Sequence, residues 1–184
     1  MDNANPNTSL EFDTVIKECR NIFVDKLADY GAAWRILRPQ SLTDQIFIKA
    51  SRIRTLETSE AMVHEGIKSE LIGIVNYAVI GMIQLQKGAA DTIDISAEQA
   101  AEMYDKFIDE TKQLLCAKNH DYGEAWRSMR PESYTDLILM KLNRTKQIED
   151  NNGQTRISEG IDANYKDILN YAAFGLIRIL ESKQ

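Results

Sequence analysis

The stretch DYGAAWR at residues 29–35 returns almost unchanged as DYGEAWR at residues 121–127, 92 positions later. At the same offset, residues 26–57 align without a gap on residues 118–149, and 16 of these 32 positions are identical. Identity of this extent indicates a duplicated unit. A period of ~90 residues is longer than that of solenoid repeats, so the sequence predicts a duplicated domain and not an open array.

A second block of matches follows a loop that is two residues longer in the second repeat. The tripeptide EGI begins at Glu65 and at Glu159, and NYA begins at Asn76 and at Asn170, which gives an offset of 94. These matches predict a division of the chain into four parts: a flexible tail at residues 1–8, a first helical repeat at 9–86, a linker at 87–95 and a second helical repeat at 96–184.

Each repeat carries the patterns of three helices. The first helix is predicted to open with a capping box, which begins at Thr8 in one repeat and at Ser96 in the other. The second helix is predicted to begin at an N-cap serine, Ser41 or Ser133. Apolar residues recur at helical spacing along these segments, and no alternation typical of strands has useful length. The patterns therefore predict an all-α protein.

The third helix of each repeat is apolar on nearly all of its sides. Such a helix is typical of the centre of a fold, and one three-helix repeat has too few neighbours to bury it. We therefore predict that the repeats form a single helical bundle with internal pseudo-twofold symmetry, in which the two third helices pair. Gly81 and Gly175 occupy matching positions there and would allow a close approach.

Composition and charge exclude several classes of protein. The 184 residues carry a formal net charge of −6, which argues against sequence-independent coating of DNA or RNA. The longest uncharged run, residues 71–86, falls short of the ~20 residues that span a bilayer. Two cysteines form no disulfide framework, and the first residues show no signal-peptide pattern. We expect a cytoplasmic protein with no membrane segment.

Polar side chains cluster on two helices of each repeat. On a helical wheel, Glu159, Asp167 and Asn170 share the face of the third helix that lies opposite its apolar stripe. The second helix carries a Lys-x-x-Arg pair, which begins at Lys49 in one repeat and at Lys141 in the other. Carboxylates hold Mg²⁺ through oxygen ligands, and Arg and Lys neutralise phosphate oxygens. The combination is suited to a nucleotide.

These residues predict a nucleotide site with three kinds of group. The candidate catalytic residues are Glu159 and Asp167, and the candidate Mg²⁺ ligands are Asp136, Glu159 and Asp167. The candidate ligand- and phosphate-binding residues recur in both repeats: Lys49, Arg52, Lys141, Arg144, Arg35, Arg127, Trp34, Trp126, Asn76 and Asn170. A tryptophan ring could stack on a base.

Structural roles would explain the same residues. Asp44 and Asp136 could cap the second helix of each repeat. The Lys-x-x-Arg pairs could form ion pairs, in the first repeat with Glu65 or Asp29. The two tryptophans could be core residues, and the two asparagines could be buried hydrogen-bonding hubs.

The string D-Y-G-x-A-W-R-x-x-R-P-x-S-x-T-D, followed by K-x-x-R, E-G-I and N-Y-A, resembles the nucleotide modification associated domain 1 family. The resemblance covers residues 10–86 and 100–181, and it implies a role linked to nucleotides with no established reaction. A weaker similarity is to the all-α nucleoside triphosphate pyrophosphohydrolases of the MazG and dimeric dUTPase type, which are Mg²⁺ enzymes. Their E-x-x-D motif would fall at residues 70–73 and 164–167, where each repeat keeps only one of the two acidic residues.

Three functions are open at this point. The chain could be a Mg²⁺-dependent nucleotide hydrolase, a non-catalytic module that binds a nucleotide or another phosphorylated ligand, or a structural helical assembly protein. Three acidic side chains within ~5 Å of one another would favour a metal site, whereas a Lys- or Arg-lined cleft without such a cluster would favour binding alone. The sequence is compatible with a homo-oligomer, and it does not predict the base, the number of phosphates or the oligomeric state.

Overall fold

The computed structural model describes residues 7–59 and 66–182, and within these ranges the chain is helical and contains no strand. The predicted all-α class is confirmed. Residues 1–6 of the predicted tail and Glu65 lie outside the described ranges. The elements in chain order are α1 (Asn7–Tyr30), η1 (Ala33–Ile36), α2 (Pro39–Thr58), α3 (Ile67–Lys87), α4 (Ala97–Tyr122), η2 (Ala125–Ser128), α5 (Pro131–Asp150) and α6 (Ile161–Glu181), where η marks a short 3₁₀ helix.

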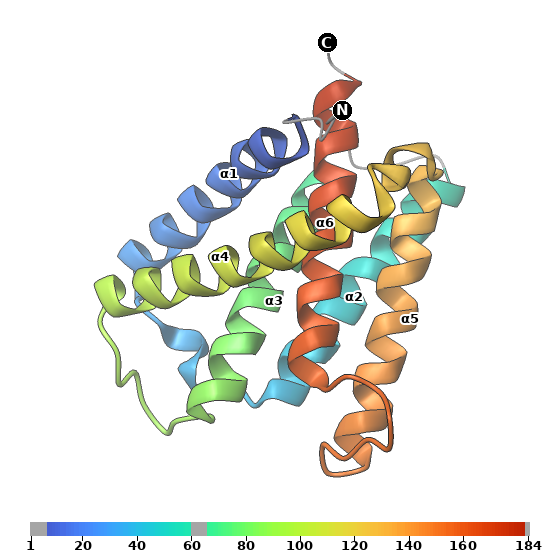
Figure 1. The fold of residues 1–184 in the computed structure, drawn as a ribbon. Coiled ribbons are helices and arrows are strands. Elements are labelled where there is room, and N and C mark those ends of the chain that lie inside the picture. Colours follow the sequence, from blue (N-terminus) through green and yellow to red (C-terminus); the bar gives the residue numbers. More distant parts are fainter. Residues whose placement is uncertain (1–6, 60–65, 183–184) are drawn as a thin grey trace.

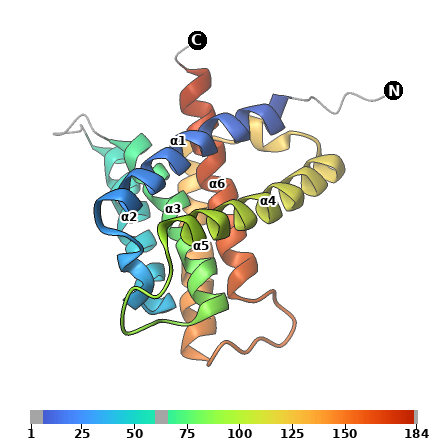
Figure 2. The same ribbon diagram turned by 90° about the vertical axis from the view of Figure 1, so that its left-hand side faces the viewer.

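The helices form three layers, with α3 and α6 in the middle (Figure 1). One outer layer consists of α2 and α5, and the other consists of α1 and α4, which lie side by side in Figure 2. Residues 74–84 of α3 are all buried except Tyr77. The prediction that the apolar third helices are central is therefore confirmed. No helix in the described ranges is long and apolar enough to cross a membrane.

The helix starts agree with the sequence prediction at one position and differ from it at three. The capping box of α4 at Ser96 is confirmed. The predicted N-caps at Ser41 and Ser133 are wrong, because α2 and α5 begin two residues earlier, at Pro39 and Pro131. Proline is favoured at the first helical position, since its fixed φ suits a helix and its missing N–H would have no partner there.

The predicted capping box at Thr8 is also wrong. Thr8 lies inside α1, and its hydroxyl forms hydrogen bonds with Glu124 and with Arg127, whose Nη2 donates to it at 3.1 Å. The Thr8 hydroxyl therefore binds the segment after α4 and does not cap its own helix.

Contacts between the two repeats occur in matching pairs, as a twofold axis requires. Arg20 of α1 pairs with Asp105 of α4 at 2.6 Å, and the equivalent residues, Lys112 and Asp13, also pair at 2.6 Å. Each pair crosses from α1 to α4 in the opposite sense, so the two helices run antiparallel. The predicted pseudo-twofold arrangement is confirmed.

The outer pair α2 and α5 shows the same reciprocity. The Thr43 hydroxyl donates to Glu149 at 2.7 Å, and the Thr135 hydroxyl donates to Glu57 at 2.6 Å. These threonines and glutamates are identical at an offset of 92. Flanking ion pairs repeat the pattern, between Arg54 and Asp136 at 3.4 Å and between Lys146 and Asp44 at 3.2 Å.

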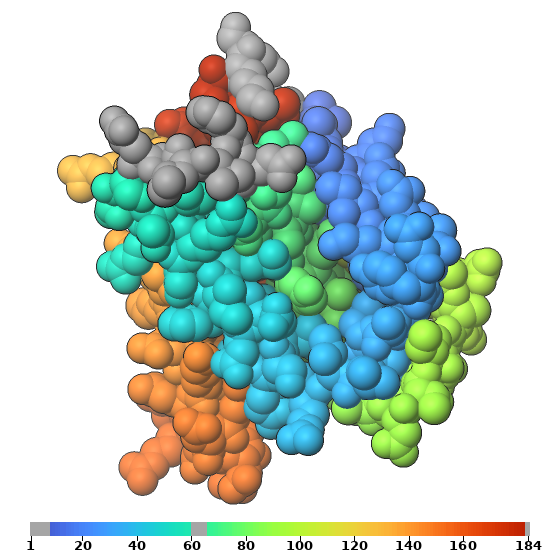
Figure 3. All heavy atoms as spheres, turned by 180° about the vertical axis from the view of Figure 1, so that it is seen from behind, coloured from blue at the N-terminus to red at the C-terminus, as the bar shows by residue number. Residues whose placement is uncertain are grey.

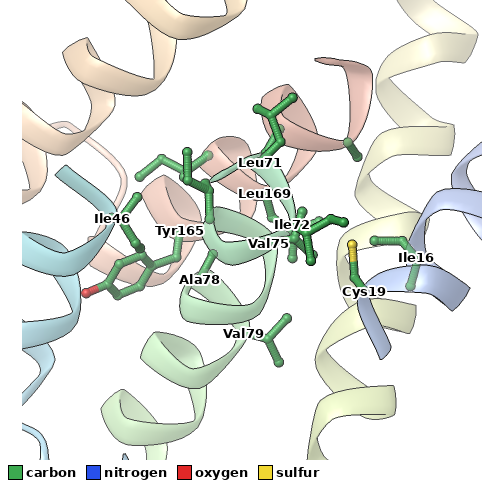
Figure 4. Close-up of a cluster of buried hydrophobic side chains, with 14 of the residues drawn as sticks. Ile16, Cys19, Ile46, Leu71, Ile72, Val75, Ala78, Val79, Tyr165 and Leu169 are labelled. Carbon is green, nitrogen blue, oxygen red and sulfur yellow. The ribbon is translucent and has the colours of Figure 1, made fainter. Parts of the chain in front are cut away.

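The central pair α3 and α6 meets at two glycines. A Cβ atom on Gly81 would lie 2.9 Å from Cζ of Tyr165, and one on Gly175 would lie 3.0 Å from Cδ1 of Leu71. Leu71 and Tyr165 occupy matching positions, so this contact is also reciprocal. Figure 4 shows Tyr165 with its hydroxyl directed toward α2, where it is 2.7 Å from the Thr43 hydroxyl. The predicted close approach of the third helices is confirmed.

Glu57 and Glu149 should make the protein less stable as the pH rises from acidic to neutral. Burial raises the pKa of both carboxyls more than their threonine hydrogen bonds lower it. A raised carboxyl pKa contributes stability below the unfolded-state value, and this is lost as the pH rises through the folded-state value. We expect the double variant Glu57→Gln and Glu149→Gln to be more stable than the wild type at pH 7, by ~0.5 kcal/mol since both groups are partly solvated.

Urea denaturation at pH 4 and at pH 7 measures this effect. The difference between the double variant and the wild type should disappear near pH 4, where the wild-type carboxyls bind protons in the folded state. A difference of the same size at both pH values would contradict the electrostatic explanation.

The two cysteines have different environments. Cys19 is buried, and burial raises the pKa of its thiol to about 12, so it remains protonated and packs as a small apolar residue. Cys116 is exposed. Only Cys19 is therefore part of the core.

Candidate functional site

Two pockets lie at matching places in the two repeats. The first-repeat pocket has a volume of about 490 Å³ and is lined by residues of α1, η1, α2 and α3, and the surface of α3 is visible between α1 and α2 in Figure 3. The second-repeat pocket has a volume of about 410 Å³ and is lined mainly by α4, η2, α5 and α6. The shared polar and aromatic positions are Lys26 and Lys118, Tyr30 and Tyr122, Trp34 and Trp126, Lys49 and Lys141, Asn76 and Asn170, and Tyr77 and Tyr171.

One carboxylate lies between two lysines in the second-repeat pocket. Asp167 accepts a hydrogen bond from Nζ of Lys118 and another from Nζ of Lys141, both at 2.7 Å. Asp167 and Lys141 are buried, whereas Lys118 reaches the solvent. Burial raises the pKa of Asp167, but the two lysines outweigh this effect and hold it below its usual value. The carboxylate is therefore ionised and forms an ion pair with each lysine.

The carboxylate of the first repeat lies one helical turn earlier. Gly73 stands where Asp167 stands in the second repeat, and Glu70 accepts hydrogen bonds from Arg52 and from Nζ of Lys49, the latter at 3.2 Å. The Lys49 side chain lies across Gly73, since a Cβ atom there would be 2.7 Å from its Cε. Lys49 and Arg52 therefore form ion pairs, as the structural alternative proposed, but their partner is Glu70 and not Asp29, and Glu65 lies outside the described residues.

A further lysine lines the first-repeat pocket. Lys26 is exposed, and no carboxylate of the described residues pairs with it. Its counterpart Lys118 holds Asp167. Neither lysine was among the predicted site residues, although their identity at an offset of 92 is a signal in the sequence.

The predicted stacking residues are mostly core residues that also reach the pockets. Trp34 and Trp126 are 8% and 7% exposed. The Trp126 ring stacks on Phe174, with centroids 4.2 Å apart, and the Arg127 guanidinium lies 4.4 Å from its centroid. Most of each tryptophan ring is therefore buried in the core, as the structural alternative proposed. The remaining part of each ring lines a pocket.

The two asparagines differ in how they are satisfied. Asn76 donates to the Cys19 carbonyl at 3.0 Å and accepts from the Tyr104 hydroxyl at 2.8 Å, so it is a buried hydrogen-bonding hub. In the second repeat, Oδ1 of Asn170 and Nε1 of Trp126 are buried and have no hydrogen-bond partner among the described residues. Buried polar atoms normally have partners, so these two atoms are suited to ordered water.

The two repeated arginines that follow the tryptophans, Arg35 and Arg127, make structural contacts. Arg35 is 2% exposed, and it binds Asp94 at 2.7 Å and the Gly88 carbonyl at 2.7 Å, which fastens the linker to η1. Arg127 pairs with three carboxylates, those of Glu11, Glu124 and Glu181. Neither arginine is among the residues that line the two pockets.

The structure does not bring the predicted Mg²⁺ ligands together. Glu159 lines the second-repeat pocket with Asp167, but Asp136 lies in a different hollow between α2 and α5, together with Arg144. Asp136 pairs there with Arg54 and lies beyond the first turn of α5, so it does not cap that helix. Within the described ranges, no three His, Cys, Asp or Glu side chains form a group that could hold a metal ion.

Comparison with known proteins identifies one family. A family model described as nucleotide modification associated domain 1 matches residues 26–85 and 118–179. No curated protein and no solved structure matches the chain. Every shared position of the two pockets lies inside the matched segments.

Proposed function

Because the chain belongs to the nucleotide modification associated domain 1 family, we propose that it binds a nucleotide without hydrolysing it. The observation that carries this proposal is the convergence of duplicated lysine, tyrosine, tryptophan and asparagine residues on two matching pockets. Ion pairing with carboxylates explains Lys49, Lys118 and Lys141, whereas packing gives no reason for the exposed Lys26 to line the first-repeat pocket.

The lining of the pockets has the chemistry that a nucleotide requires. Lysine ammonium groups neutralise phosphate oxygens. Tyrosine and tryptophan rings offer faces to a base, and an asparagine amide can both donate and accept hydrogen bonds. Volumes of about 490 and 410 Å³ lie in the range of small-molecule sites.

The arrangement of the acidic residues favours binding over hydrolysis. A Mg²⁺ hydrolase needs carboxylates that are free to hold the metal. Asp167, the candidate at the centre of such a site, is bound by Lys118 and Lys141. Glu70 in the first repeat is bound by Lys49 and Arg52.

Replacing Lys49 by methionine tests the proposal. This variant keeps most of the apolar stem and removes the charge, while Arg52 still pairs with Glu70. Loss of a hydrogen bond to a charged group costs ~1.5 kcal/mol or more, so we expect nucleotide binding to weaken about tenfold. Isothermal titration with the common nucleoside mono- and triphosphates measures the dissociation constant.

Lys87→Met is the matched control, because Lys87 is exposed at the end of α3 and lines neither pocket. Its binding constant should equal that of the wild type. Equal affinities of the wild type and Lys49→Met would refute the proposed site. Release of phosphate or pyrophosphate from a triphosphate in the presence of Mg²⁺ would refute binding without hydrolysis.

A further inference from the structure

The two pockets differ in the position of their carboxylate, so they differ in their capacity to bind an anionic ligand. On the basis of the proposed function, we propose that only the first-repeat pocket binds the ligand. It takes the phosphate of a nucleoside monophosphate between Lys26 and Lys49, at the place that the Asp167 carboxylate fills between the equivalent lysines of the second repeat.

Asp167 shows how the lysine pair binds an anion. Its two oxygens accept one hydrogen bond each from Lys118 and Lys141, both at 2.7 Å. The side chain therefore presents two oxygens to two ammonium groups, as a phosphate would. Because this carboxylate is part of the chain, the second-repeat pocket contains its own anion.

The first-repeat pocket offers the same lysine positions without that carboxylate. Gly73 has no side chain, and Lys26 has no carboxylate partner among the described residues. Lys49 shares Glu70 with Arg52, so Arg52 can keep Glu70 paired when Lys49 turns toward a ligand. In the second repeat, by contrast, Lys118 and Lys141 are both bound to Asp167.

The charge of the first-repeat pocket selects a monophosphate. A phosphate monoester carries about −1.5 to −2 at pH 7, which two lysines neutralise. A triphosphate carries more charge, and the described residues lining this pocket offer no third cation. The remaining wall is largely aromatic and aliphatic, with Tyr30, Trp34 and Ile36 among its residues, which suits a nucleoside.

A stability measurement tests the anion position without any ligand. Gly73→Asp adds a carboxylate at the position of Asp167, and Gly73→Asn adds an amide of the same shape. Either side chain displaces only the flexible end of Lys49. We expect the Asp variant to melt about 2–4 °C above the Asn variant at low salt, with a smaller difference in 1 M NaCl. A melting temperature of the Asp variant at or below that of the Asn variant would overturn the anion position.

Isothermal titration with the 5′-monophosphates of the common ribo- and deoxyribonucleosides tests the ligand. We expect one molecule bound per chain, an affinity about tenfold lower in Lys26→Met, an unchanged affinity in the control Lys87→Met, which lines neither pocket, and no binding in Gly73→Asp. Two equal sites, or a Lys26→Met affinity equal to that of the wild type, would overturn this inference and leave the proposed function standing. If no nucleotide binds, the proposed function and the ligand class both fail, and the comparison of Asp with Asn at position 73 still decides the anion position.

Discussion

Replacing Asp167 by alanine should lower the free energy of unfolding by about 3 kcal/mol, because removal of one partner from a buried ion pair leaves an unpaired charge. The charge left behind is that of Lys141, whose side chain is 11% exposed, at 2.7 Å from the lost carboxylate. Lys118 is affected less, since its side chain is 44% exposed and can turn to water. Chemical denaturation at pH 7 measures the loss.

Glu70→Ala is the matched control in the first repeat. It also removes a carboxylate held by two cations, but the side chains of Lys49 and Arg52 are 26% and 45% exposed. Because both can be solvated, we expect a loss of only ~1 kcal/mol. Equal losses from Asp167→Ala and Glu70→Ala would contradict the importance of burial at Lys141.

The effect of Asp167→Ala should depend on pH in one direction. The pKa of Asp167 is lowered in the folded protein, so the carboxylate contributes stability above the unfolded-state pKa of ~3.9, and this is lost as the pH falls through the lowered value. The difference between the wild type and the variant should therefore be constant from about pH 5 to pH 7 and shrink below about pH 4.

The fold could be predicted because the duplication indicates which helices of the two repeats pack against each other. An apolar third helix that occurs twice predicts a central pair, and the matching glycines Gly81 and Gly175 indicate where the pair is closest. The identical residues Thr43 and Thr135 were also visible in the alignment. Their role was not, because a hydrogen bond to a glutamate of the other repeat depends on the antiparallel packing of α2 and α5.

The sequence predicted some of the residues that line the two pockets, and it did not predict how their charges pair. The helical wheel placed Glu159, Asp167 and Asn170 on one face, and all three line the second-repeat pocket. A wheel considers one helix at a time, so it could not show that Lys118 and Lys141 reach Asp167 from α4 and α5.

Identity between the repeats was a weaker guide to function at the arginines. Arg35 and Arg127 occupy the same position in the repeated motif, yet Arg35 binds the linker through Asp94, whereas Arg127 binds carboxylates of α1 and α6. Each arginine is therefore a buried or half-buried cation, and in each repeat different neighbouring groups pair with it. Such residues remain identical for structural reasons, so identity alone did not distinguish them from the lysines of the pockets.

Replacing Gly81 by alanine should destabilise the protein by ~2 kcal/mol, in spite of the higher helix propensity of alanine. The added methyl group would lie 2.9 Å from Cζ and 3.0 Å from Cε2 of Tyr165. That ring has no room to move, because it is fully buried and its hydroxyl is bound by Thr43 and by the Pro39 carbonyl. Overpacking of this kind is expected to weaken the contact between α3 and α6.

The pseudo-twofold axis supplies the control for this prediction. Gly175→Ala adds the same methyl group at the equivalent position, where it would lie 3.0 Å from Cδ1 of Leu71. Leucine can rotate its terminal methyl groups, so the gain in helix propensity should offset most of the strain, and we expect a change within ~1 kcal/mol. Guanidinium denaturation of the two variants decides the matter, since equal stabilities would show that the rigidity of Tyr165 does not control how closely the central helices pack.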